Sequence, residues 1–155
     1  MDETGLRFRL RHRLLLGARA VMSNIRKVML VDDEPDIRRI AQLSLQHLGP
    51  WQVVVAASGR EAVDQARSEA PDLILLDVMM PQMDGPQTLQ ELRSDPSLEE
   101  TPVIFMTAKT RHDDLAHYVS IGAVGVIAKP FNPVNLAGDI RRILDTALQT
   151  PRAEP

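Results

Sequence analysis

The chain has 155 residues, of which 44% are hydrophobic and 25% charged, a size and balance typical of one globular domain and not of a disordered or fibrous protein. It contains no cysteine, which excludes disulfide bonds, zinc–thiolate sites and cysteine nucleophiles. The formal net charge is −3 and no apolar run is long enough to span a membrane, so we predict a cytoplasmic protein whose acidic body does not bind nucleic acid.

Residues 1–24 differ from the rest of the chain in charge, because they hold five arginines against two acidic residues. The segment has no sustained helical period, and Gly17 and Arg19 interrupt the apolar run that a secretory signal needs. We predict a basic, disordered extension, or upstream sequence before a true start at Met22. Contact with a membrane surface or nucleic acid is the alternative interpretation of these arginines.

The body begins with a strand and an amphipathic helix. Residues 27–31 form a β-rich run that ends in an acidic triplet, and Pro35 follows where a helix can begin. The helix predicted over 36–48 ends before Gly49. Its buried face should consist of the apolar residues that recur with the helical period, which are Ile37, Ile40, Ala41, Leu45 and Leu48.

A second strand and helix follow, and then a strand of a different kind. The strand is predicted over 51–56, and Ser58 with Glu61 three residues later forms a capping-box signature for a helix to about residue 69. Residues 73–76 are all apolar and lead directly into Asp77. Such a run is typical of a strand that is covered on both faces.

The second half of the chain repeats the alternation of strand and helix. Its predicted parts are a loop over 78–86, a helix through about 93, a strand over 102–106 ending at Thr107, a helix over 113–121 closed by Gly122, a strand over 125–128, and a helix to about 148 with Asn132 and Pro133 as cap and first residue. Five strands alternating with five helices predict an α/β fold with a doubly wound, parallel sheet. We expect one domain over 25–148, a flexible tail over 149–155, and no second domain after it.

Polar residues stand at four of the predicted strand ends, where open parallel sheets bind their ligands. They are Asp32 and Asp33 after the first strand, Asp77 after the third, Thr107 and Ala108 after the fourth, and Lys129 after the fifth. Each has a plain structural interpretation when taken singly; the aspartate pair, for example, could balance a helix dipole. Their joint placement at one edge predicts a phosphoryl site.

The chemistry of such a site follows from its charges. Crowded carboxylates raise one another's pKa unless a cation shares them, and carboxylate oxygens with water suit magnesium best. A bound ion would position phosphoryl oxygens, and a carboxylate beside it could act as nucleophile and form an aspartyl phosphate. Lys129 would pair with one phosphoryl oxygen and Thr107 would donate a hydrogen bond to another, while the small Ala108 leaves space for the incoming group.

Several motifs resemble the receiver domains of response regulators in two-component signalling. They are Leu30-Val31-Asp32-Asp33-Glu34, Leu76-Asp77-Val78-Met79-Met80-Pro81, Asp84-Gly85, Thr107-Ala108 and Lys129-Pro130-Phe131, in the expected order and at the expected spacings. The resemblance covers about residues 27–148. It implies a flavodoxin-like (βα)5 fold with five parallel strands in the order 2-1-3-4-5.

The resemblance also implies a role for each site residue. Asp77 would accept a phosphoryl group from a sensor histidine kinase or a histidine phosphotransfer protein. Asp33 and Asp77 would bind Mg²⁺ or Mn²⁺, Asp32 would act as a ligand through water, and the backbone carbonyl of Met79 would complete the protein's share. The Lys129-Pro130 peptide would be cis, which proline tolerates.

The sequence departs from the receiver pattern at one position that bears on switching. Receivers generally carry an aromatic residue three positions before the lysine, and this residue turns inward when the threonine engages the phosphoryl group. Here the position holds Val126. The phosphorylation chemistry should survive this change, but no aromatic side chain at this position can change its rotamer when the domain is phosphorylated.

We expect a stand-alone phosphoacceptor domain that catalyses its own phosphorylation and dephosphorylation, switches the binding of a protein partner, and is not a turnover enzyme. A phosphorylation-independent interaction module is one alternative. A magnesium-dependent aspartyl-phosphate phosphohydrolase is another, but such enzymes place a general acid where this chain has Met79 and add a cap domain. The cognate kinase, the downstream partner and homodimer formation are left open.

Overall fold

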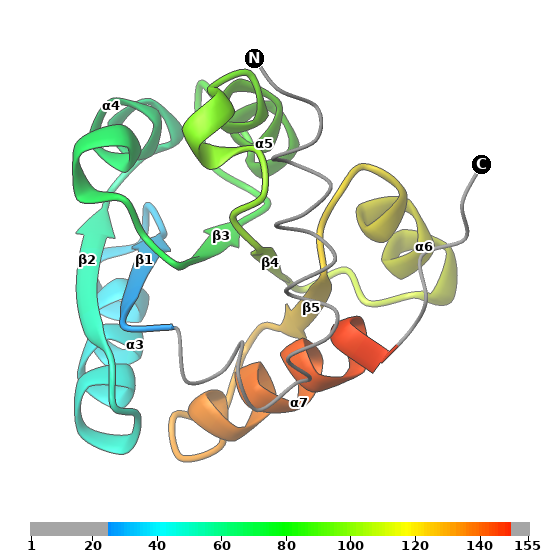
Figure 1. Ribbon diagram of the computed structural model, residues 1–155. Helices are drawn as coiled ribbons and strands as arrows, with labels where there is room; N and C mark the ends of the chain where they lie inside the picture. Colours follow the sequence, from blue (N-terminus) through cyan, green and yellow to red (C-terminus); the bar gives the residue numbers. More distant parts are fainter. Residues whose placement is uncertain (1–24, 150–155) are drawn as a thin grey trace.

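The computed structural model describes residues 25–149 and shows a single parallel sheet flanked by helices (Figure 1). The strands are β1 (Lys27–Val31), β2 (Gln52–Ala56), β3 (Leu73–Asp77), β4 (Val103–Thr107) and β5 (Gly125–Ala128). The helices are α3 (Pro35–Leu48), α4 (Gly59–Glu69), α5 (Gly85–Arg93), the short 3-10 helix η1 (Pro96–Leu98), α6 (His112–Ser120) and α7 (Leu136–Gln149). The strand order β2-β1-β3-β4-β5 confirms the predicted fold.

Alternate strand residues supply two separate hydrophobic clusters, one on each face of the sheet. In β3, Leu73 and Leu75 point to one face, and Ile74 and Leu76 point to the other. The first face is covered by α3 and α7, and the second by α4, α5 and α6 (Figure 1). Because both faces are covered, β3 is apolar throughout until Asp77 ends the strand.

The predicted buried face of α3 was partly wrong. Ala41 and Leu45 are buried as expected, but Ile40 and Leu48 are 43% and 51% exposed. The third buried position of this helix is Ser44. At about 100° per residue, Ile40 lies roughly 90° from the centre of the face that Ala41, Ser44 and Leu45 share, and Leu48 is the last residue of the helix.

The start of the last helix was also misplaced. Asn132 does accept a hydrogen bond through its side chain, from the backbone N–H of Val134 at 3.0 Å. This bond belongs to a turn over 133–135, and the regular helix begins only at Leu136. Pro133 therefore sits in the connection between β5 and α7 and not in the first turn of the helix.

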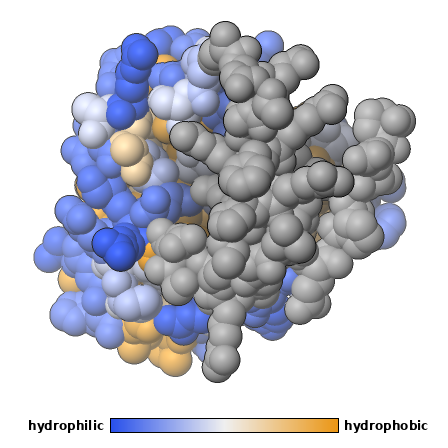
Figure 2. Space-filling model, in the orientation of Figure 1, coloured by the Kyte–Doolittle hydropathy of each residue, from blue (hydrophilic) through white to orange (hydrophobic). Residues whose placement is uncertain are grey.

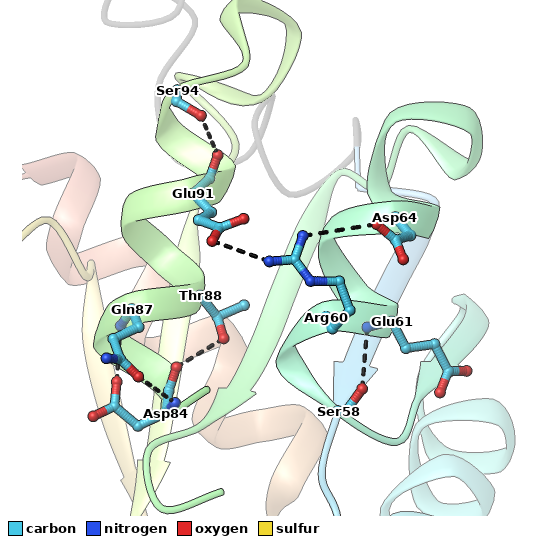
Figure 3. A network of polar contacts seen from close by, with 9 residues as sticks. All are labelled: Ser58, Arg60, Glu61, Asp64, Asp84, Gln87, Thr88, Glu91 and Ser94. Carbon is cyan, nitrogen blue, oxygen red and sulfur yellow. Dashed lines mark hydrogen bonds and ion pairs between the residues drawn. The ribbon is translucent and has the colours of Figure 1, made fainter. Parts of the chain in front are cut away.

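Side-chain caps fix the starts of α4 and α5, which lie next to each other (Figure 3). The Ser58 hydroxyl accepts the backbone N–H of Glu61 at 3.1 Å, as predicted. The Glu61 carboxylate accepts the N–H of Ala57 at 3.1 Å, so the reciprocal bond ends one residue earlier than in a regular capping box. Between the helices, the Arg60 guanidinium lies 3.2 Å from the Glu91 carboxylate (Figure 3).

The described surface that is visible in Figure 2 is mostly hydrophilic, with scattered hydrophobic residues. Within residues 25–149, no helix has the length and apolar character that crossing a membrane requires. The predicted basic extension over 1–24 and residues 150–155 of the predicted tail lie outside the described residues.

Candidate functional site

The polar residues predicted to meet at one sheet edge follow or end four parallel strands. Asp32 comes directly after β1, Asp77 ends β3, Thr107 ends β4 and Lys129 follows β5. All neighbouring strands are parallel, so these ends lie on the same side of the molecule. The sheet topology alone therefore brings residues together that are as much as 97 positions apart.

Three carboxylates form a compact cluster at this edge. Oxygen atoms of Asp32, Asp33 and Asp77 all lie within 4.8 Å of one another. Asp32 is fully buried and Asp77 is 3% exposed. One oxygen of Asp33, Oδ1, is buried and has no hydrogen-bond partner among the described residues. A buried carboxylate oxygen without a donor is costly, which marks this as a place for a cation or a donor from outside the chain.

Lys129 lies between two of the carboxylates. Its Nζ is 2.9 Å from Oδ2 of Asp32 and 3.2 Å from Oδ2 of Asp77, and the side chain is only 14% exposed. The Lys129-Pro130 peptide is cis, as the family resemblance implied. One ammonium group faces three carboxylates, so this edge carries excess negative charge.

Burial and charge shift the pKa values of the two central groups. Burial, together with the negative charge of Asp32, raises the pKa of Asp77 from 3.8 to about 6, although Lys129 acts against this. For Lys129, burial by itself lowers the pKa, but the hydrogen bond and charge of Asp32 and the charge of Asp77 outweigh it, so that its pKa is raised. At neutral pH both groups are therefore charged, and Asp77 is a more basic nucleophile than an exposed aspartate.

Thr107 is joined to the site through its backbone and its hydroxyl. Its carbonyl accepts the N–H of Lys129 at 2.9 Å, which places the start of the lysine loop beside the end of β4. Its hydroxyl oxygen accepts the N–H of Lys109 at 3.0 Å. Because the oxygen acts as acceptor there, the hydroxyl proton stays available to donate.

Two residues at the start of α3 take part in the site although sequence reasoning gave them no role. The Arg38 guanidinium donates to the backbone carbonyl of Asp32 at 2.7 Å. The Glu34 carboxylate lies 3.6 Å from Nζ of Lys129, and its backbone N–H donates to Oδ1 of Asp32 at 2.9 Å. A signal existed in the sequence, since Glu34 directly follows the acidic pair and Arg38 lies in the first turn of the helix that begins after it.

The segment after Asp77 combines an exposed loop with a closely packed start of α5. Met79, whose carbonyl the resemblance offers as a metal ligand, has a side chain that is 65% exposed. Gly85 approaches the strand so closely that a Cβ there would lie 2.6 Å from the carbonyl oxygen of Asp77 and 2.8 Å from Cα of Val78. The Asp84-Gly85 motif therefore sets the path of the backbone beside Asp77.

Val126 lies on β5 opposite Phe105 of β4 and packs against the cluster under α4, α5 and α6. The ring of Phe105 meets the ring of Tyr118 on α6 edge-on, with the centroids 5.3 Å apart. The aromatic contact near this strand end is therefore made by α6 and β4, and β5 contributes an aliphatic side chain to it.

The donor set fits a hard divalent cation. All three acidic groups offer carboxylate oxygens, which magnesium prefers, and nitrogen or sulfur ligands are absent from this group of residues. Asp33 supplies an unpartnered oxygen, and the lysine compensates only part of the negative charge.

Comparison with known proteins places this geometry in a family. The sequence model of the response regulator receiver domain matches residues 28–141. Response regulator Rre1 of Synechocystis sp. is 38% identical over 117 residues, which are 76% of this chain and 51% of that protein. The alkaline phosphatase synthesis transcriptional regulatory protein PhoP of Bacillus subtilis is 35% identical over 119 residues, which are 77% of this chain and 48% of that protein.

Solved structures agree with this assignment. Chemotaxis response regulator CheY4 of Vibrio cholerae has a TM-score of 0.72 and 34% sequence identity, and the match covers 77% of this chain and 99% of that one. The chain spans about half the length of the curated relatives named above. From the matching motifs, the fold and these similarities together, the chain belongs to the response regulator receiver domains of two-component signalling.

Proposed function

We propose that this domain accepts a phosphoryl group on Asp77 from a histidine kinase or a histidine phosphotransfer protein, and that the phosphorylated form binds a protein partner differently. The observation that carries the proposal is the position of Lys129, whose Nζ reaches both Asp32 and Asp77 from 97 and 52 positions away in the sequence. A partly buried ammonium group shared by two carboxylates is arranged to meet further negative charge at Asp77.

The proposed reaction is a phosphoryl transfer between two side chains. An oxygen of the Asp77 carboxylate forms a bond to phosphorus, while the bond between phosphorus and the donor's imidazole nitrogen breaks and the nitrogen keeps the bonding electron pair. The product is an acyl phosphate on Asp77. Water later cleaves this acyl phosphate, which releases inorganic phosphate and returns the carboxylate, so the domain resets itself without acting as a turnover enzyme.

Asp32, Asp33, Asp77 and the Met79 carbonyl would hold Mg²⁺ or Mn²⁺, with Asp32 acting through water. When bound, such an ion neutralises charge on the phosphoryl oxygens and orients them for transfer. The unpartnered Oδ1 of Asp33 supports this assignment, because an ion would satisfy it.

Lys129 and Thr107 would stabilise the transferred group. The ammonium of Lys129 can turn from Oδ2 of Asp77 to a phosphoryl oxygen on the same residue with little movement. The Thr107 hydroxyl, whose proton is free to donate, would bond another phosphoryl oxygen. Ala108 next to it is exposed and small, which leaves space for the donor.

The test is labelling with acetyl phosphate and Mg²⁺, followed by intact-mass spectrometry. The wild-type chain should gain one phosphoryl group, and Asp77→Asn should gain none. Asp113→Asn is the matched control, because it makes the same chemical change at an exposed residue in the first turn of α6. If Asp77→Asn takes label at the wild-type rate, the acceptor assignment is wrong.

Two measurements separate this proposal from its alternatives. Steady release of phosphate from small phosphate esters would favour a phosphohydrolase. Mg²⁺ at ten times its dissociation constant should stabilise the fold by about 1.4 kcal/mol, and the absence of any shift would favour an interaction module without chemistry.

A further inference from the structure

A buried hydroxyl interrupts the apolar face of α3. Ser44 is 6% exposed and lies between Ala41 and Leu45, the two apolar residues that pack against the sheet. Burying a hydroxyl is unfavourable unless it has a partner. The Ser44 hydroxyl has one, since it donates to the backbone carbonyl of Pro133, which is 89 positions away.

The carbonyl that Ser44 holds belongs to the connection that carries Lys129. This connection comprises residues 129–135. At its start, the N–H of Lys129 donates a hydrogen bond to the Thr107 carbonyl. Further along, Asn132 bonds only within the turn, to the N–H groups of Val134 and Asn135. Of the hydrogen bonds described for residues 130–135, only the one from Ser44 reaches beyond this connection and the helix α7 that follows it.

The same helix also holds the opposite wall of the site. Through Arg38, α3 binds the carbonyl of Asp32 at 2.7 Å, and through Ser44 it binds the carbonyl of Pro133. One rigid helix is thus fastened to the loop of Asp32 and to the loop of Lys129. The two side chains that these loops carry meet at 2.9 Å.

We infer that Ser44 is a positioning residue for Lys129: by fixing the connection 129–135 to α3, it keeps the Lys129 ammonium within reach of Asp32 and Asp77. The inference rests on the proposed function only for its effect on phosphorylation, since the effect on the position of Lys129 does not depend on any reaction. Ser44 touches neither the acidic cluster nor the acceptor, so it acts through the loop.

Loss of the Ser44 hydroxyl should change the rate of phosphorylation but not the stabilisation of the fold by Mg²⁺. In Ser44→Ala, the Pro133 carbonyl loses its donor and Lys129 gains freedom, so labelling by acetyl phosphate should slow by about five- to tenfold. The carboxylate cluster is held from β1, β3 and Arg38, so the stabilisation of the fold by Mg²⁺ should stay as in the wild type.

Thr88→Val is the matched control. Thr88 is buried too, and its hydroxyl also donates to a backbone carbonyl, that of Asp84 at 2.7 Å (Figure 3). It lies on α5, which covers the opposite face of the sheet. Both variants remove one buried hydroxyl of this kind, so a general loss of stability would slow both. The inference requires that Ser44→Ala slows labelling and that Thr88→Val does so by less than twofold.

A chemical footprint tests the position of Lys129 without any phosphorylation. The full chain is acetylated briefly with a lysine-specific reagent, and the modification of Lys129 relative to the exposed Lys109 is measured by peptide mass spectrometry. Ser44→Ala should raise this ratio several-fold, and Thr88→Val should leave it unchanged. An unchanged ratio in Ser44→Ala, or equal slowing of labelling in both variants, overturns the inference. If the wild type takes no label, the proposed function fails, and the acetylation ratio still decides the role of Ser44.

Discussion

The ammonium of Lys129 lies 2.9 Å from Oδ2 of Asp32, a carboxylate that is fully buried. The same ammonium is 3.2 Å from Asp77, so one cation offsets two buried negative charges. Such a pair is weak evidence for net stability, because removing two charges from water costs about as much as their attraction returns. Removing one partner is different, since the other charge then stays buried and uncompensated.

Lys129→Met should therefore destabilise the fold strongly at neutral to alkaline pH in the presence of EDTA. We expect a loss of about 3 kcal/mol in the free energy of unfolding, measured by urea denaturation. Lys109→Met makes the same chemical change at an exposed position and should cost less than about 0.5 kcal/mol. Saturating Mg²⁺ should restore part of the loss, because a cation again faces the carboxylates. Equal losses in the two variants would contradict the assigned role of the buried pair.

The raised pKa of Asp77 predicts how stability depends on pH without metal. The folded state binds the Asp77 proton more tightly than the unfolded state, whose aspartate has a pKa near 3.8. The contribution of Asp77 to the free energy of unfolding is therefore most favourable below pH 4. It falls as the pH rises from about 4 to 6 and is constant above that. The total fall is at most about 3 kcal/mol, because each pKa unit corresponds to about 1.4 kcal/mol.

Asp77→Asn replaces the ionisable carboxyl with an amide that stays uncharged, and it tests the direction in which Asp77 changes stability with pH. In EDTA the variant should be more stable than the wild type above pH 6, and the two should converge near pH 4. Asp113→Asn makes the same chemical change at an exposed position and is the control. The measurement is the urea midpoint at several pH values, and a variant that is less stable than the wild type at pH 8 would show that the sign is wrong.

Much of the fold could be predicted from the sequence because each strand obeys one simple rule. Strands covered on both faces are apolar throughout, so the run before Asp77 stands out, and the polar residues that follow the strands mark the sheet edge. The parallel topology then brings these ends together whatever their separation in the chain. The placement of Asp32, Asp77 and Lys129 at one edge followed from this rule alone.

The side-chain contacts within the site could not be predicted in the same way. The apolar pattern of α3 does not fix its rotation about its own axis, so Ile40 was assigned to the core although Ser44 occupies that place. The bond of Arg38 to the Asp32 carbonyl depends on how the first turn of α3 sits over the loop. That position is set by packing between segments that lie far apart in the sequence.

Gly85→Ala should disturb the backbone next to the proposed acceptor. The added Cβ would lie 2.6 Å from the carbonyl oxygen of Asp77, a distance that the backbone cannot accommodate without moving. We expect a loss of about 1–3 kcal/mol in the free energy of unfolding, and slower labelling by acetyl phosphate.

Gly138→Ala is the control for this change. Gly138 lies inside α7, and a Cβ there would meet nothing within 4 Å. The substitution should raise the free energy of unfolding by about 0.5–1 kcal/mol, because alanine favours the helix, and it should leave the labelling rate as it is. If both variants change the free energy of unfolding and the labelling rate alike, the close approach at Gly85 does not restrict which residue fits there.

Ala70→Gly should stabilise the protein, although it removes a side chain. Ala70 ends α4 in the left-handed conformation, with φ 46°, and its N–H donates to the carbonyl of Ala66 at 2.9 Å. This conformation costs a non-glycine residue roughly 1–2 kcal/mol. Glycine avoids that cost, but the greater conformational freedom of the unfolded chain with glycine offsets part of the benefit. We expect the free energy of unfolding to rise by about 0.5–1 kcal/mol. Ala66→Gly, inside the same helix and fully buried, should lower it by about 1 kcal/mol or more. Urea denaturation of both variants gives the comparison, and a loss of stability in Ala70→Gly would mean that the left-handed cap carries no strain.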